Sequence, residues 1–285
     1  MKRFILIMFC IGWGTALLAQ NEETGKKSDT IKVGGLIIIT KKDKNKRSGS
    51  DVEVKNKNNK NWDEGRKKRK NSNISNNWFS VDLGFTNMKD ETVYTSPDAV
   101  SMLRPTFSTP APGAPDFKLR TGKSVNVNVW IFMQKLNMIK HVLNLKYGIG
   151  LELNNYRYKS PISFKDGSPA TIIRDSVSFS KNKLAVDYVT VPMMLNINPS
   201  GKGGFSISGG LSVGYRYSAR NKQISDARGK QREKGEFGLN PWKLAVVGDV
   251  GWGGLRFFGS YSLTNLYEKG LNMTPYSVGL RFSSW

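Results

Sequence analysis

Apolar and polar residues alternate one by one along much of the chain after residue 77. The segment FSISGGLSVGYRY, residues 205–217, shows the pattern most clearly. Its apolar set is Phe205, Ile207, Leu211, Val213, Tyr215 and Tyr217, and the other set is Ser206, Ser208, Gly210, Ser212, Gly214 and Arg216. Side chains of a β-strand point alternately to its two sides, so this segment is predicted to be a strand with one apolar and one polar face.

Eight segments carry this alternation, separated by polar breaks that contain Gly and Pro. The predicted strands span 78–88, 124–133, 142–156, 184–197, 205–217, 242–250, 255–263 and 274–282, and the fourth is the least regular. The apolar set of the second strand is Val125, Val127, Val129, Ile131 and Met133, opposite Asn126, Asn128 and Trp130. No segment has the period of an amphipathic helix of useful length, so the pattern predicts an all-β fold for residues 76–285.

The breaks between these strands alternate in length. The first, third, fifth and seventh are long, at roughly 89–123, 157–183, 218–241 and 264–273, whereas the others are short. An up-and-down meander with long loops at one end and tight turns at the other produces this alternation. It is typical of an eight-stranded antiparallel outer-membrane β-barrel, whereas a sandwich with Greek-key crossings has no reason to sort its loops this way.

The polar face consists mostly of Ser, Gly and Asn with a few charges of both signs. The charged residues on it are Asp82, Lys146, Glu152, Arg216, Asp249, Arg256 and Arg281. Such side chains suit the narrow interior of an eight-stranded barrel, where the charges must pair. Leu211 and Val213 are then predicted to face hydrocarbon, and Ser212 and Arg216 to face inward. The alternative is a soluble periplasmic lipocalin-like binding barrel, in which the apolar face lines a ligand cavity.

The first residues have the layout of a secretory signal peptide. Lys2 and Arg3 precede a short apolar run, and small residues lead to Ala19-Gln20, so a signal peptide is predicted at 1–19 in preference to a membrane anchor. Cys10, the only cysteine, lies inside this run, and His141 is the only histidine. Neither thiol chemistry nor a His- or Cys-based metal site is therefore expected after cleavage, and no cofactor is predicted.

Basic residues concentrate in residues 20–75, ahead of the predicted barrel. The formal net charge of the chain is +22, and a large part of the excess lies in this stretch, which is also rich in Asn, Ser and Gly. We interpret it as a largely disordered periplasmic tail with a short β-prone segment at 30–40. The RKKRK run at 66–70 resembles a nuclear localisation patch, but behind an export signal it is better explained as a solvated linker, and no nucleic-acid partner is expected.

Three features together bring a family to mind: the leader that ends in Leu-Ala-Gln, the segment YVTVPMMLNI at 188–197, and a last strand rich in Tyr, Gly and Phe. Residues 76–285 resemble the PorT-like outer-membrane β-barrel family, a resemblance that implies an eight-stranded barrel in the outer membrane of Gram-negative bacteria. Proline cannot donate to a β-ladder, so Pro192 is predicted to mark a bulge. At the C-terminus, Phe282 is in phase with the outward set and Trp285 is not, so the last strand either stops at Phe282 or is bulged.

The resemblance implies location more than activity, because some PorT-like members serve protein export and most have no assigned role. The first hypothesis is a non-enzymatic structural or interaction component, possible partners being outer-membrane lipid, the barrel assembly machinery, and an envelope protein that contacts residues 21–73. The second is a small pore, although eight strands leave no aqueous channel. The third is an enzyme, but His141 lies in a short turn without a nucleophile elbow, so no catalytic residue is predicted.

Two further segments admit a functional and a plain interpretation. GKGGFSISGG at 201–210 resembles a phosphate-binding loop, yet a strand follows it instead of a helix, so it is predicted to be a turn. PTFSTPAPGAP at 105–115 is expected to be an extended, mobile loop, either a ligand for a partner or, by preference, a plain surface loop.

Overall fold

The computed structural model describes residues 29–33, 36–40, 52–56, 72–199 and 204–283. The chain divides into two units, Met1–Lys70 and Asn71–Trp285. The described strands of the first unit are β1 (Asp29–Val33), β2 (Leu36–Thr40) and β3 (Val52–Asn56), an antiparallel sheet in that order. The β-prone run at 30–40 thus falls in β1 and β2. The predicted signal peptide, the RKKRK run and Trp285 lie outside the described residues.

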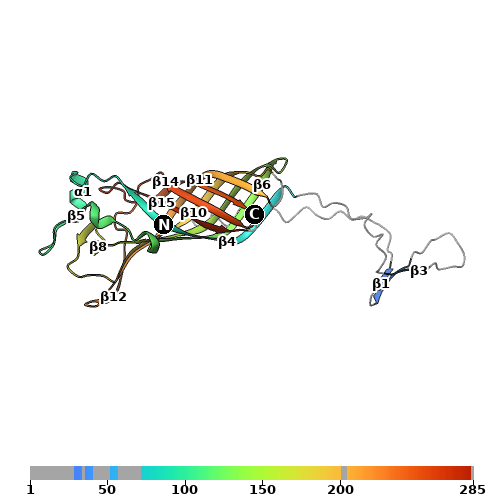
Figure 1. The fold of residues 1–285 in the computed structure, drawn as a ribbon, viewed down its shortest axis with the longest axis horizontal. Coiled ribbons are helices and arrows are strands. Elements are labelled where there is room, and N and C mark those ends of the chain that lie inside the picture. Colours follow the sequence, from blue (N-terminus) through green and yellow to red (C-terminus); the bar gives the residue numbers. More distant parts are fainter. Residues whose placement is uncertain (1–28, 34–35, 41–51, 57–71, 200–203, 284–285) are drawn as a thin grey trace, which may run out of the picture. The chain divides into compact units, whose positions relative to one another are not determined.

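In the described part of the second unit, eight antiparallel strands close into a barrel (Figure 1). Each strand pairs with the next along the chain, and the last pairs with the first. They are β4 (Ile74–Asp90), β6 (Val125–Ile139), β7 (Leu143–Arg157), β10 (Lys181–Ile197), β11 (Phe205–Ser225), β13 (Trp242–Trp252), β14 (Leu255–Ser262) and β15 (Met273–Phe282). The predicted all-β barrel is confirmed, and β15 ends at Phe282.

The two faces of the strands are oriented as the alternation predicts. On β11, Leu211 and Val213 are 49% and 46% exposed on the outer surface, whereas Ser212 between them is buried. The same order holds on β4, where Leu83 and Phe85 are exposed and Asp82 is buried. A lipocalin-like barrel has the opposite arrangement, so that alternative is wrong.

Bulges in β6 reverse part of its alternation. The pairing of β6 with β7 shifts by one residue between Trp130 and Phe132, and again between Asn137 and Ile139. An extra residue moves the side chains that follow it to the other face. Met133, predicted on the outward face, is therefore inward and 3% exposed, packed with Trp130 and Met194. The prediction for Met133 was wrong.

The bulge predicted at Pro192 is also misplaced. Val191, Pro192 and Met193 pair with β11 in continuous register, and the shift lies between Asp187 and Tyr188. Pairing with β7 is interrupted at residues 191–192 and resumes in the same register. The missing N–H of proline removes a rung of the ladder here without inserting a residue.

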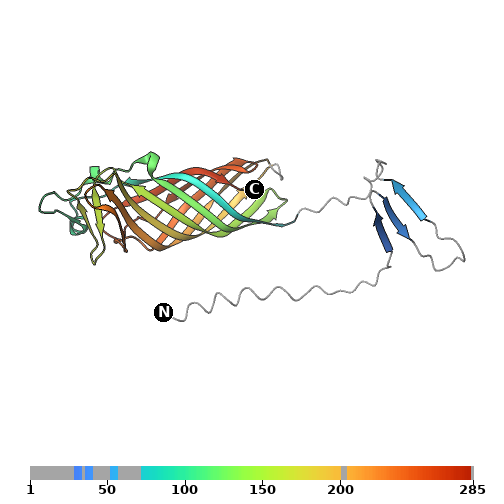
Figure 2. The same ribbon diagram turned by 90° about the horizontal axis from the view of Figure 1, so that it is seen from below.

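The long connections all lie at one end of the barrel, which we call the loop end, and the short turns lie at the other, the turn end (Figures 1 and 2). The loop end holds α1 (Pro97–Met102), β5 (Leu103–Arg104), the 3-10 helices η2 (Ala114–Phe117) and η3 (Thr121–Lys123), β8 (Ile162–Lys165), β9 (Thr171–Arg174) and β12 (Gly229–Lys234). β5, β9 and β8 form a small sheet, and β12 pairs with the end of β11. Among the described residues, no helix is long and apolar enough to cross a membrane.

A hydrophobic core joins these connections to the ends of the barrel strands. Phe164 of β8 packs against Tyr158 and Phe237, with ring centroids 5.3 Å and 6.3 Å apart. Leu184 and Tyr188 of β10 belong to the same buried cluster. The loop end is therefore a packed structure, because burial of these side chains removes a large apolar area from water.

Candidate functional site

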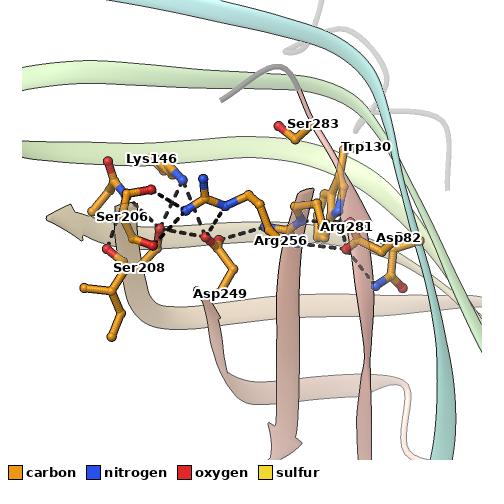
Figure 3. A network of polar contacts seen from close by, with 12 residues as sticks. Asp82, Trp130, Lys146, Ser206, Ser208, Asp249, Arg256, Arg281 and Ser283 are labelled. Carbon is orange, nitrogen blue, oxygen red and sulfur yellow. Dashed lines mark hydrogen bonds and ion pairs between the residues drawn. The ribbon is translucent and has the colours of Figure 1, made fainter. Parts of the chain in front are cut away.

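The inner face of the barrel carries a network of buried charges that cross-links the strands (Figure 3). Arg281 of β15 reaches Asp82 of β4 with two hydrogen bonds, Nε to Oδ1 at 2.7 Å and Nη2 to Oδ2 at 2.8 Å. Trp130 of β6 donates from Nε1 to Asp82 Oδ2 at 2.7 Å. Paired donors of this kind satisfy a carboxylate that water does not reach.

Asp249 of β13 forms the second node of the network. It accepts from Arg281 Nη1 at 3.0 Å and from Arg256 Nε of β14 at 2.6 Å. Lys146 of β7 lies 3.7 Å from the same carboxylate and donates to Ser208 Oγ of β11 at 3.0 Å. The charged residues of the two nodes thus connect five of the barrel strands, and Trp130 and Ser208 add β6 and β11.

A separate cluster surrounds Glu152 of β7. Lys243 of β13 donates to Glu152, which also accepts from Asn154 at 3.0 Å and from Thr190 at 3.4 Å. Lys243 was not among the inward charges predicted from the sequence. The sequence does contain a signal for it. Lys243 precedes Asp249 on β13 by six residues, an even number, so the two side chains share a face with residues 245 and 247.

Most of the predicted inward charges come together in these two clusters, but Arg216 does not. Arg216 lies nearer the loop end, where its Nη2 donates to the carbonyl of Leu239 at 3.2 Å. It therefore links β11 to the connection that follows β12, and takes no part in the ion-pair network of the interior.

Large side chains fill the space that the charged residues leave. Gly150 faces the Trp130 ring, and a Cβ at this position would lie 2.6 Å from Trp130 Cε3. The cavity bounded by Trp130, Glu152 and Arg281 measures only about 20 Å³. This is room for about one water molecule. Around Trp130, Glu152 and Arg281 the interior is therefore a packed polar core.

The structure brings no catalytic group to His141. This residue lies in the turn between β6 and β7 with φ at +60°, and its backbone N–H donates to Asn137 Oδ1 at 2.7 Å. Among the described residues, no hydrogen bond joins its imidazole to a serine or a carboxylate, and no group of three or more His, Cys, Asp or Glu side chains is placed to hold a metal ion.

The Pro-rich segment 105–115 is anchored, contrary to the expectation of an extended, mobile loop. Thr106 and Thr109 close a turn, and Thr109 Oγ1 donates to the carbonyl of Arg174 at 2.6 Å. The Asp116 carboxylate accepts from Gly113 N–H at 2.9 Å and from the Arg174 guanidinium. Packing against β9 could not be foreseen from the local composition. Phe107, at the tip of this loop, is fully exposed.

Another ion pair ties the small sheet to the β11–β12 hairpin. Arg228 forms two hydrogen bonds with the Asp175 carboxylate, at 2.7 Å and 3.0 Å, and Ser163 donates to Asp175 at 3.1 Å. Burial acts to raise the pKa of Asp175, but these hydrogen bonds, together with one from the Val177 N–H, hold the pKa below its usual value. Asp175 is therefore charged at neutral pH and holds the hairpin in place.

The outer face is apolar between two groups of exposed aromatic residues. Those towards the turn end are Trp78, Phe79, Phe205, Trp252 and Phe282, and those towards the loop end are Tyr215, Tyr217, Trp242, Tyr261 and Tyr276. Val and Leu side chains such as Val191 and Leu211 are exposed between them. Aromatic belts of this kind lie at the two interfaces of a bilayer.

A closed barrel with a paired, charged interior and an apolar outer face edged by aromatic residues is a transmembrane β-barrel. The chain belongs to the family described as outer membrane protein beta-barrel domain, whose family model matches residues 73–268. The predicted location in the outer membrane is thereby confirmed. No curated protein matches the chain.

Solved structures of similar fold include two of Ail, the attachment invasion locus protein of Yersinia pestis. The first is 10% identical with a TM-score of 0.32, and covers 73% of this chain and 97% of that chain. The second, a complex with the heparin analogue sucrose octasulfate, is 9% identical with a TM-score of 0.31 and the same coverage. Values this low support no inference about function.

Proposed function

We propose that this protein is a non-enzymatic component of the outer membrane that presents its loop end as a contact surface outside the cell. The observation that carries this proposal is the hydrophobic core of the loop end, which includes Phe164, Phe237 and Leu239. Such a core orders the connections before any partner binds, so a partner meets a preformed surface and less conformational entropy is lost on binding.

The competing functions have less support. A pore needs an open lumen, and the space beside Trp130 and Glu152 holds about one water molecule. An enzyme of the acyltransferase or protease class needs a nucleophile beside a base, and His141 lies at the turn end without such a neighbour among the described residues. A contact function requires neither.

The N-terminal segment gives the second half of the proposal. The N-terminal segment, residues 20–75, joins the barrel at the turn end, because β4 begins there. With the loop end outside the cell, this junction is on the periplasmic side. The basic side chains and the strands β1 to β3 suit a partner in the envelope that is acidic or has a free sheet edge. Together with the PorT-like resemblance, this favours a role in export or envelope assembly, alongside contacts with outer-membrane lipid and the barrel assembly machinery.

Site-specific labelling tests the orientation. Phe107→Cys places a thiol at the exposed tip of a long loop, and Ser72→Cys places one at an exposed position two residues before β4. Both variants carry Cys10→Ser. A membrane-impermeant maleimide added to intact cells is expected to label the Phe107→Cys variant, and to label the Ser72→Cys variant only after the outer membrane is permeabilised. The reverse pattern would overturn the orientation.

Crosslinking at the same positions tests the contact function. A photoreactive amino acid at position 107 is expected to give a discrete adduct with an envelope component, whereas one at lipid-facing position 213 is expected to give none with protein. Equal adduct patterns at the two positions would contradict a dedicated contact surface at the loop end.

A further inference from the structure

Four basic side chains stand in a row across neighbouring strands at the loop end. Arg157 of β7 pairs with Lys183 of β10, Lys183 pairs with Lys222 of β11, and Lys222 pairs with Arg232 of β12. Directly opposite residues share a face of the sheet, with Cβ atoms about 4.5–5.5 Å apart. Like charges in this arrangement repel each other, so the row is unfavourable for folding by itself.

All four side chains lie on the outer face of the sheet. Their neighbours in sequence, such as Tyr156, Leu184 and Asn221, point inward and are buried. Gln223, also inward, donates to Ser163 of β8 at 2.8 Å, so the inner face of this sheet is covered by the loop-end core. On the outer face, Arg157, Lys183 and Lys222 are partly exposed and Arg232 is exposed.

Further basic residues extend the row in both directions. On the side away from the barrel, Ile224 stands between Lys181 and Lys230. On the side towards the barrel, Arg220 pairs with Lys234. We call the set Arg157, Lys181, Lys183, Lys222, Lys230, Arg232 and Lys234 the basic face. The positive charges of Lys230, Lys181 and Arg232 lower the pKa of Lys222.

Carboxylates offset only a part of the charge of the basic face. The charge of Asp187 acts to raise the pKa of Lys183, but burial and the neighbouring Lys181 and Lys222 outweigh it and lower that pKa. Asp187, on the same outer face of β10, is paired with Arg220, and Glu233 of β12 is paired with Lys165 on the opposite side. Asp226, in the β11–β12 turn, forms no ion pair within residues 72–199 and 204–283, and neither does any member of the basic face. The charge is therefore available to an external anion.

The position of the basic face relative to the apolar surface indicates which anion. Tyr217, exposed on β11 at the edge of the apolar surface, precedes Lys222 by five residues. At about 3.3 Å per residue and a tilt of about 40°, Lys222 lies roughly 12 Å above Tyr217 along the barrel axis. Headgroups extend roughly 5–8 Å beyond the hydrocarbon for a simple phospholipid. The row that contains Lys222 thus lies just above the headgroup layer of a simple phospholipid.

We propose that the basic face is a binding site for the phosphate groups of an anionic, phosphorylated glycolipid in the leaflet that surrounds the loop end. A headgroup with several phosphates on a sugar scaffold reaches the height of the row, which a simple phospholipid headgroup does not. Cations spaced along a sheet then each meet a phosphate, and the repulsion within the row is relieved by the ligand. This binding site would be a part of the proposed contact function. It rests on the proposed orientation of the barrel in one respect, namely which leaflet of the membrane surrounds the loop end.

Binding of diphosphoryl lipid A to the full chain in phosphatidylcholine nanodiscs tests this site. The variant Lys183→Gln/Lys222→Gln/Arg232→Gln removes three charges from the basic face and is expected to weaken the binding by about 100-fold. The matched control Lys118→Gln/Lys123→Gln/Lys269→Gln removes three exposed charges elsewhere at the loop end and is expected to bind like the wild type. Equal weakening in the two variants would overturn the site.

Lys222→Glu separates binding from folding. A glutamate at this position stands between Lys183 and Arg232, so it replaces two repulsions by two attractions. Amide exchange in β12 is expected to slow while lipid A binding is lost. If this variant binds lipid A as tightly as the wild type, the row is a solvated surface and the proposal is wrong.

A competition experiment identifies the source of the phosphate. A soluble inorganic polyphosphate is expected to compete poorly with lipid A for the nanodisc-embedded chain, and polyphosphate binding without lipid A binding would overturn the lipid assignment. Because nanodiscs carry lipid A in both leaflets, this result is independent of the orientation. The labelling at residues 72 and 107 does not depend on lipid A. The orientation and the lipid site can therefore be refuted independently of each other.

Discussion

At the scale of single residues, Leu211 reports most directly on the solvent of the outer face. It is half exposed on β11, between the aromatic groups at the two ends of the apolar surface. Leu211→Arg is expected to cost about 2–4 kcal/mol, because a charge near the bilayer midplane loses its hydration. The measurement is the fraction of the protein in isolated outer membranes whose migration on a detergent gel changes on boiling, as that of a folded barrel does. Leu211→Met is the control. Wild-type assembly of the arginine variant would show that Leu211 does not face hydrocarbon.

The Glu152–Lys243 pair gives a second test at this scale. Both side chains are buried in the interior, so Lys243→Met leaves the Glu152 carboxylate without its cation. This change is expected to destabilise the barrel by about 3–5 kcal/mol, whereas the double variant Glu152→Gln/Lys243→Met is expected to recover most of the loss. Urea unfolding of the refolded chain in detergent measures both. If the double variant is no more stable than the single one, the pair is not coupled as described.

At the scale of elements, alternation predicts strands well because membrane and interior demand opposite side chains along every strand. β7 and β15 keep this period throughout and were predicted with nearly their observed bounds. β6 and β11 were predicted less well, because each contains a bulge: the pairing of β6 with β7 shifts between Trp130 and Phe132, and Tyr217 of β11 is the extra residue where the pairing with β10 shifts between Asp187 and Tyr188. A bulge is set by register against the neighbouring strand, and that information is not local in the sequence.

The loop end could not be predicted for a similar reason. Each connection contributes a few buried side chains, such as Met102, Phe164 and Phe237, to one core. Separately, these segments are too short and too polar to indicate a packed structure. The inward charges were predictable because each stands on the polar face of an alternating strand. The basic face became visible only when the strand register placed Arg157, Lys183, Lys222 and Arg232 side by side.

At the scale of the whole barrel, closure and filling of the interior belong together. Eight strands leave room only for side chains, and the charges at Asp82, Asp249 and Glu152 are compensated by cations from other strands. A hydrated lumen would weaken these pairs by screening, while a purely apolar lumen would leave the carboxylates unsatisfied. The interior therefore contributes cross-strand links that the apolar outer face, surrounded by lipid, does not supply.

This organisation predicts that the barrel does not conduct ions. The cavity beside Trp130, Glu152 and Arg281 holds about one water molecule, and the hydrophobic core of the loop end lies over the barrel mouth. The purified chain, reconstituted in a planar bilayer, is therefore expected to show no stepwise conductance at moderate voltage, next to a large porin as the positive control. A gel shift on boiling first shows that the protein is fully folded. If conductance steps persist in such protein, the polar core opens. Transport would then have to be considered beside the contact function proposed for the loop end.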